Sequence, residues 1–280
     1  MKRSLWLLCS TTLTLGALAS CESSKPATDV SATAGTTSPA SRTATSNEAM
    51  ESNGIRLTPF SDSPKFPEAQ LQLRTPIGGS TVPSGEVAFD YQITNFLLTK
   101  MSGGPHMAQM ANSMKGQHIH NIVDNEPYTA HYETKFSKPI PDGQHVVLSF
   151  LSRSYHESLK HRGAYDLRVI KVGTVPAGTP AIDTKAPHMF YSRPKDTYAG
   201  ADARRIMLDF YLVNTTLESG GNRVRATING TEFMLDKWLP YMMEGLPAGE
   251  NTVKLELVDA SGTMIPGPFN SVTRTFTVAP

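Results

Sequence analysis

The sequence predicts an all-β chain that contains two tandem β-sandwich domains. Three features of its 280 residues indicate this fold: short runs in which apolar and polar residues alternate, Gly- and Pro-containing turns between those runs, and an internal duplication. Short strands at regular spacing with such turns are typical of sandwiches of the immunoglobulin or fibronectin type III kind. The one stretch with helical character is 236–243, where we expect a single turn of helix.

The duplication is clearest in two segments, 116–125 and 221–230, which align without a gap at a shift of 105 residues. Both begin with glycine, both carry apolar or β-branched residues at the fourth and eighth positions, and both place cation-capable side chains at the third and fifth positions. Two further pairs of segments occur in the same order in both copies. The pair 89–95 and 208–214 precedes these segments, and the pair 140–143 and 246–249 comes after them. Features present in both copies are expected to serve the fold, and features present in one copy are candidates for function.

The strand and turn pattern predicts one sandwich at 68–173 and a second at 186–280. A linker that contains Pro and Gly, 174–185, joins them. Upstream, the segment 57–67 contains three prolines and no alternation, so we expect an extended connector that leads into the first strand.

A secretory signal is predicted at 1–20. Lys2 and Arg3 form a short basic region, and the apolar stretch 5–19 is too short to span a bilayer. The segment Leu18-Ala19-Ser20-Cys21 resembles the bacterial lipobox. That resemblance implies cleavage before Cys21 and attachment of lipid to it, which would hold the protein at a membrane.

The resemblance also implies a location in the bacterial cell envelope. Glu22 stands where an aspartate retains enterobacterial lipoproteins in the inner membrane, so the outer membrane is the expected location. Residues 21–53 are rich in Ser, Thr and Ala and lack apolar periodicity, which predicts a disordered tether.

Cysteine and charge counts exclude several classes of function. Of the two cysteines, Cys9 leaves with the signal and Cys21 carries lipid, so no thiol remains for a disulfide, a cysteine-based zinc site or a cysteine nucleophile. Loss of Lys2 and Arg3 leaves 24 of the 26 basic residues against 25 acidic ones, which argues against nucleic acid as a partner.

Histidine is what differs between the two copies. Of the 8 histidines, only His188 belongs to the second copy. In the first copy, period-two alternation places His118 and His120 on one face of a strand, together with Ile122. The partner strand, 146–151, presents apolar side chains on the same face. This apolar, histidine-lined face is expected to be covered or to bind something.

Three interpretations of this face stay open. The first is packing against the second domain or an upstream segment. The second is binding of copper or zinc through His118 and His120, with His145 or His156 as a further ligand, because neutral imidazole suits these metals. The third is binding of a glycan, a peptide or another organic ligand, since tyrosines occur at 128, 132 and 155.

An insertion upstream of the histidine strand is rich in methionine. It contains Met101, His106, Met107, Met110 and Met114. Thioether and imidazole together favour Cu(I). Methionine is also the flexible side chain that fills gaps in cores, so a packing role is the alternative and is slightly preferred.

The pattern Gly-x-His-x-His followed by Asp, and then Pro-x-Gly-x-His, resembles small secreted bacterial domains of unknown function that occur in tandem in lipoproteins. The matching positions here are Gly116, His118, His120, Asp124, Pro141, Gly143 and His145. The resemblance implies a fold and a location rather than a chemistry, and it places any site in the first domain. A looser similarity is to periplasmic copper carriers of immunoglobulin-like fold.

The segment 152–161 separates two predicted strands and is too polar for a core. Arg153, Tyr155 and Glu157, beside His156, form a candidate site for an anionic or sugar ligand at the rim of the sandwich; a solvated loop is the alternative. Adjacent residues cannot adopt the geometry of a catalytic triad, and the sequence has no nucleophile-elbow motif. We therefore expect no enzymatic activity.

Together these patterns predict a lipid-anchored binding or accessory protein of the cell envelope, with copper or zinc as the candidate ligand of the first domain. The alternative is a structural or interaction module without metal that presents a face to an envelope protein or a glycan.

Overall fold

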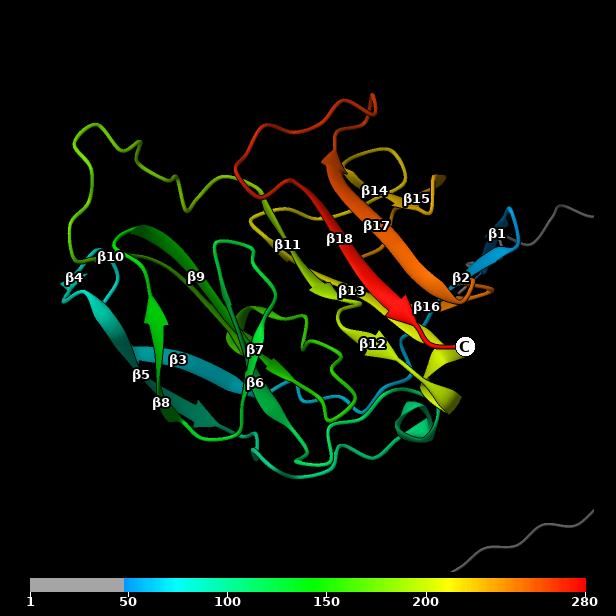
Figure 1. Ribbon diagram of the computed structural model, residues 1–280, viewed down its shortest axis with the longest axis horizontal. Coiled ribbons are helices and arrows are strands. Elements are labelled where there is room, and N and C mark those ends of the chain that lie inside the picture. The colour runs from blue at the N-terminus through cyan, green and yellow to red at the C-terminus, as the bar shows by residue number, and fades with distance from the viewer. Residues whose placement is uncertain (1–47) are drawn as a thin grey trace, which may run out of the picture. The chain divides into compact units, whose positions relative to one another are not determined.

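The computed structural model describes residues 48–280. The predicted signal at 1–20, the predicted lipidation site at Cys21 and most of the predicted tether lie outside the described residues. Those described form eighteen strands and three short 3-10 helices (Figure 1), and none of these helices has the length and apolar character needed to cross a bilayer.

The strands of the first domain are β3 (Gln70–Thr75), β4 (Thr81–Val82), β5 (Gly85–Thr94), β6 (His118–Val123), β7 (Thr129–His131), β8 (Lys135–Ile140), β9 (Gly143–Ser152) and β10 (Tyr165–Val172), with η1 (Pro105–Ala108) and η2 (Arg162–Ala164). The remaining elements are β1 (Met50–Ser52), β2 (Ile55–Pro59), β11 (His188–Arg193), β12 (Thr197–Tyr198), η3 (Gly200–Ala203), β13 (Ile206–Val213), β14 (Arg223–Ile228), β15 (Thr231–Leu235), β16 (Tyr241–Glu244), β17 (Gly249–Val258) and β18 (Ser271–Val278).

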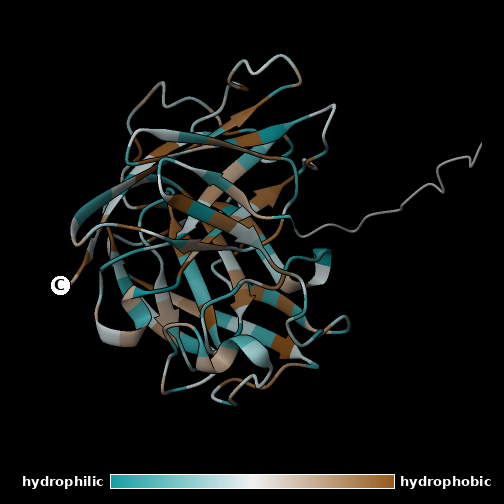
Figure 2. Ribbon diagram, turned by 90° about the vertical axis from the view of Figure 1, so that its right-hand side faces the viewer, coloured by the Kyte–Doolittle hydropathy of each residue, from teal (hydrophilic) through white to brown (hydrophobic). Residues whose placement is uncertain are grey.

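The first domain is a sandwich of two sheets with strand orders β3-β5-β8 and β4-β10-β9-β6-β7. All pairs are antiparallel except the short edge strand β4, which runs parallel to β10. The inward residues of both sheets, among them Leu73, Phe89, Ile119 and Val147, share one buried core. Figure 2 shows how apolar and polar residues alternate along the strands. This arrangement confirms the predicted immunoglobulin-like sandwich.

The second domain repeats the topology of the first. Its sheet β12-β18-β17-β14-β15 has the order of β4-β10-β9-β6-β7, and β11, β13 and β16 are arranged as β3, β5 and β8. A register shift between Leu73 and Thr75 recurs between Tyr191 and Arg193, at the same place in the first strand of each copy. The internal duplication is therefore confirmed by topology as well as by sequence.

The hairpin β1–β2 belongs to the second domain, which corrects the expectation of an extended connector from residue 57. β2 pairs with β16 (Figure 1), and the register of this pair places Leu57 opposite Met243. Ile55 and Leu57 are buried in the core of the second domain. The last residues of the predicted tether, Met50–Ser52, form β1. The sequence pattern for this strand is weak, because only two inward apolar residues, Ile55 and Leu57, precede the proline-containing stretch.

The predicted helical turn at 236–243 is wrong. Residues 236–240 are irregular, and Tyr241–Glu244 forms β16 between β2 and β13. Tyr241 and Met243 point into the core of the second domain, while Met242 packs on the other side with Phe60. Apolar residues occupy both faces of this segment, as is usual for a strand that is buried on both sides. Pairing with β2 and β13 favours the extended strand over a helical turn.

The apolar outer face of the first domain is covered by the second domain. Ile122, Val146, Leu148 and Phe150 share a buried cluster with residues of β11 and β13, namely Phe190, Tyr211 and Val213. The packing interpretation is therefore confirmed for the apolar part of this face. The histidines of β6 lie at the edge of the same interface.

Candidate metal centre

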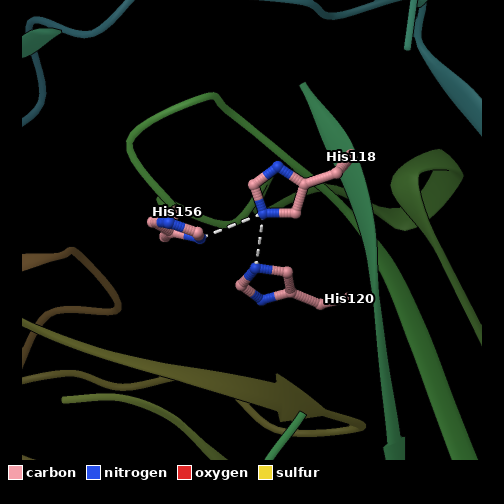
Figure 3. Close-up of side chains that lie close together, drawn as sticks. All are labelled: His118, His120 and His156. Atoms are coloured by element: carbon pink, nitrogen blue, oxygen red, sulfur yellow. Dashed lines mark hydrogen bonds between the residues drawn. The ribbon is translucent and has the colours of Figure 1, made fainter. Parts of the chain in front are cut away.

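Three histidines of the first domain converge on one point (Figure 3). His118 and His120 come from β6, and His156 comes from the loop after β9. Nε2 of His118 lies 2.9 Å from Nε2 of His120 and 3.0 Å from Nδ1 of His156. One ring nitrogen from each lies within 4.8 Å of the others. The structure thus brings together three of the four histidines proposed as metal ligands.

Local backbone geometry aims each ring at this point. The period of β6 places His118 and His120 on the same face. Gly116 has φ 85°, and a Cβ there would collide with the carbonyl of Thr99, so the Gly of the Gly-x-His-x-His pattern permits the close approach that leads into β6. His156 has φ 67°, in a turn closed by its N–H donating to the carbonyl of Arg153 at 2.9 Å. Histidine is among the residues that tolerate this left-handed conformation.

The hydrogen bonds of His118 fix its tautomer. The carbonyl of Gly116 accepts from Nδ1 of His118 at 2.8 Å, so the proton of the neutral ring sits on Nδ1. Nε2 then carries a single lone pair, although two other imidazole nitrogens face it. Among residues 48–280, Nδ1 of His120 is buried and has no hydrogen-bond partner. A metal-binding histidine commonly donates its second N–H to a carbonyl in this way, which aims the free lone pair at the metal.

Aromatic rings enclose the three imidazoles. His118 and His120 are 0% exposed. The ring of Tyr128 stacks on that of His120, with 3.5 Å between centroids and 10° between planes. The hydroxyl of Tyr128 lies 3.3 Å from Nδ1 of His156, and the ring of Tyr132 lies 5.1 Å from that of His118. The rings are therefore held in place in a region that excludes bulk water.

This environment keeps the histidines neutral. Burial lowers the pKa of His118 to about 4. Burial also lowers the pKa values of His120 and His156 well below the ordinary value of 6.5, and the nearby positive charge of Arg193 acts in the same direction on both. Neutral imidazole is the form that binds metals, so these rings are in their ligating form at neutral pH.

His145 lies apart from the other three histidines. Its Nδ1 lies 2.6 Å from the carboxylate of Asp124, and its Nε2 donates to the carbonyl of Pro141 at 2.8 Å. Because both ring nitrogens are engaged, His145 supports the start of β9 rather than the cluster. Of the two further ligands considered from the sequence, His156 alone is near His118 and His120.

The methionine-rich insertion mainly packs. Met107 and Met110 lie in a small core with Phe60 and Tyr155. His106 contacts the carboxylate of Asp62 at 2.5 Å. Met101 and Met114 are 39% and 91% exposed. Met107 and Met110 therefore have the predicted packing role, in which methionine fills gaps in a core.

The segment with Arg153, Tyr155 and Glu157 is buried, which rules out the alternative of a solvated loop, and the three side chains contact one another or the core instead of standing free at the rim. Arg153 pairs with Glu157 at 2.9 Å and donates to the carbonyl of Pro64 at 2.6 Å, while Glu157 accepts from Ser63. These polar side chains satisfy one another and hold the segment that follows β2. Arg153 and Glu157 also line a cavity of about 550 Å³, whereas Tyr155 faces the methionine core.

Two cations lie beside the histidines, and both come from the second copy. Comparison of the two copies did not predict them. The guanidinium of Arg193 and the ammonium of Lys195 lie 5.7 and 4.5 Å from the ring centre of Tyr128. No local pattern indicates Arg193 or Lys195 as site residues, because the second copy lacks the histidine pattern of the first. Their position at the end of β11 beside the domain interface follows from the packing of the two domains.

No protein-family model and no curated protein matches this chain. Among solved structures it is similar to the fibronectin(III)-like modules of Clostridium thermocellum CbhA, at 8% identity and TM-score 0.26, covering 75% of this chain and 94% of that one. Similarity to Bacteroides ovatus SGBP-B, solved with a mixed-linkage heptasaccharide, has 8% identity and TM-score 0.23 over 75% of this chain and 47% of that one. The central fibronectin-III array of RIM-binding protein follows at 11% identity and TM-score 0.23, covering 78% and 69%.

Proposed function

We propose that this chain is a lipid-anchored binding protein of the cell envelope that holds a transition metal at His118, His120 and His156. The anchor is inferred from the lipobox-like segment that ends at Cys21. The metal site is supported by one observation above all. Nε2 of His118, whose second nitrogen is committed to the Gly116 carbonyl, faces two further imidazole nitrogens at 2.9 and 3.0 Å.

The spacing of the nitrogens suits a first-row metal after a small movement of the rings. Ligands about 2.0–2.1 Å from a tetrahedral metal lie roughly 3.3 Å apart. Two separations here are 2.9 and 3.0 Å, and all three ligand nitrogens lie within 4.8 Å of one another. A shared metal therefore requires the first two pairs to open by a few tenths of an ångström and the His156 ring to move toward His120. Without metal, the ring nitrogens of His120 and His156 compete for the single lone pair on Nε2 of His118. A bound metal would replace these two contacts with three nitrogen–metal bonds.

The charges around the cluster favour Cu(I) over a divalent ion. Arg193 and Lys195 both lie beside Tyr128, whose ring stacks on His120. In a buried region the repulsion between these cations and a bound metal grows with the charge of the metal. Cu(I) carries one charge, Zn(II) carries two, and Cu(I) is stable with three ligands. We therefore infer a Cu(I) centre with zinc as the weaker alternative.

The expected role is binding rather than catalysis. The three nitrogens are enclosed by Tyr128, Tyr132 and the neighbouring domain, whereas a catalytic metal needs a position open to substrate. A buried three-histidine site instead suits retention, delivery or sensing of the metal.

The test is metal content followed by competitive titration of the purified protein with Cu(I) and Zn(II), beside the His118→Ala/His120→Ala variant. His131→Gln is the matched control, since His131 pairs with Ile119 and stacks on Phe136, on the face of the sheet opposite His118 and His120. We expect one-to-one Cu(I) binding that the double variant abolishes and the control retains. Failure of the parent protein to bind either metal would leave the histidines as packing residues and favour the structural or interaction module.

A further inference from the structure

Two hollows meet at Trp238 and His161, on the boundary between the two domains. The first has a volume of about 550 Å³, and the second has a volume of about 530 Å³. Their walls come from both domains, and each volume is within the range of about 300–1,000 Å³ that is usual for small-molecule sites. His118, His120 and His156 line neither hollow, so this region is separate from the metal centre.

Rigid aromatic rings line the two hollows. The indole N–H of Trp238 donates to the carbonyl of Phe210 at 3.0 Å, and the ring packs edge-on against Tyr211 at 5.1 Å. These contacts fix the indole, which lines both hollows. Phe66 lines the first hollow, and Tyr165 lines the second. One face of each ring has a cation of this chain over it: Arg153 over Phe66, Lys160 over Trp238 and Arg162 over Tyr165. The face turned away from the cation is the one that can offer contact area to the C–H face of a sugar ring at little entropic cost.

The charged side chains of the two hollows are mainly cationic. Lys65 and Lys160 line the first, and Arg162 lines the second. The acidic Glu157 of the first hollow is paired with Arg153 at 2.9 Å. Lys160 is paired with the buried Asp209, whereas Lys65 and Arg162 are exposed. Each hollow therefore has an exposed cation in its lining.

We propose that the two hollows form one groove that binds an acidic oligosaccharide, with sugar rings on Trp238 and carboxylates at Lys65 and Arg162. Flat aromatic faces favour sugar rings as the occupant, and the exposed cations favour sugars that carry carboxylates. In the second hollow the amide N–H groups of Asn214 already donate to the carbonyls of Thr184 and Ala186, which leaves its side-chain carbonyl and the hydroxyl of Thr216 for the sugar hydroxyls.

The sequence provides a direct probe of this groove. The chain has two tryptophans, Trp6 and Trp238, so in the full chain carrying Trp6→Phe the only indole fluorescence comes from Trp238. Titration with tetragalacturonate is expected to change that emission saturably. Neutral cellotetraose is expected to bind at least about tenfold more weakly, and added salt is expected to weaken the tetragalacturonate response.

Two variants test the assignment. Lys65→Gln/Arg162→Gln changes exposed side chains, so the fold should persist by circular dichroism while tetragalacturonate affinity falls at least about tenfold. Trp238→Phe, followed by calorimetry, is expected to weaken binding while keeping the domain boundary packed.

Three results would overturn the proposal. They are an unchanged Trp238 emission with tetragalacturonate, equal affinity for cellotetraose, and tighter binding of a poly-glutamate peptide. The last of these would assign the groove to acidic peptides. None of these results depends on metal binding, so the groove and the metal centre succeed or fail separately.

Discussion

The rings of Phe150 on β9 and Tyr211 on β13 stack across the domain boundary, with 4.6 Å between centroids and 16° between planes. Both side chains are 0% exposed. The hydroxyl of Tyr211 donates to the carbonyl of Leu159 at 2.9 Å, so the same residue also fixes the loop beside the Trp238 groove. The domain interface is thus a true core, and both candidate sites lie along its margins.

Truncation of this stack should destabilise both domains together. Phe150→Ala removes a fully buried ring and is expected to cost about 3–5 kcal/mol of unfolding free energy in chemical denaturation. Tyr211→Phe is the matched control, because it keeps the stack and loses one hydrogen bond, for about 1 kcal/mol. Equal costs for the two variants would show that the stack contributes little.

The β1–β2 hairpin should stabilise the second domain, although it precedes the first in sequence. Leu57 is 0% exposed in the second core and lies opposite Met243. Leu57→Ala is therefore expected to cost about 2–5 kcal/mol. Hydrogen exchange should show the loss of protection in β16 before β6. Arg56→Ala, at an exposed position of the same strand, should have a small effect.

Much of this architecture was predictable because strand periodicity is a local property. The alternation around Ile119 and Val123 is enough to assign one face of β6 to the core and the other to His118 and His120. The glycines and prolines of both copies marked the turns. Gly116 and Gly221, and Pro141 and Pro247, recur at shifts of 105 and 106 residues, which helped to reveal the duplication.

What the sequence could not provide depends on contacts between distant segments. His145 precedes the predicted strand 146–151 and His156 follows it, and only the three-dimensional course of the loop after β9 brings His156 inward. Arg193 reaches the site because two domains pack face to face, which no local pattern records. The polar segment around Arg153 is buried because Glu157 and the Pro64 carbonyl pair with it, and such pairing is invisible in composition.

The metal-free protein should lose stability as the pH falls through the range of the buried histidines. An unfolded histidine binds its proton near pH 6.5, whereas folded His118 has a pKa of about 4. Between these pH values the unfolded state binds more protons than the folded state. The contribution of the neutral buried histidine to the free energy of unfolding is therefore fully present above about pH 6.5 and declines toward pH 4. His118 alone accounts for on the order of 3 kcal/mol by pH 4.

Urea denaturation at a series of pH values checks this dependence. His118→Gln should flatten the decline between pH 6.5 and 4, because it removes a group that titrates on unfolding. A variant with the same slope as the parent protein would contradict the assignment of His118 as a buried neutral group. Bound metal should steepen the decline, since protons and metal compete for the same nitrogens.

Arg193 should set the preference between Cu(I) and zinc. Its guanidinium donates to the hydroxyl of Tyr198 at 2.8 Å and is 8% exposed, so its charge acts on the cluster with little screening by solvent. Arg193→Gln removes one positive charge. The resulting gain in binding free energy is proportional to the charge of the metal, so the factor gained in zinc affinity should be about the square of that for Cu(I).

Competitive titrations of the two metals measure both factors, with circular dichroism confirming the fold of the variant. Arg223→Gln is the control, because Arg223 occupies in β14 the position that His118 occupies in β6 and carries its charge in the second domain. Its substitution should leave both affinities within about twofold of the parent values. Equal factors for zinc and Cu(I) in Arg193→Gln would mean that packing against Tyr128, rather than charge, couples this arginine to the histidines.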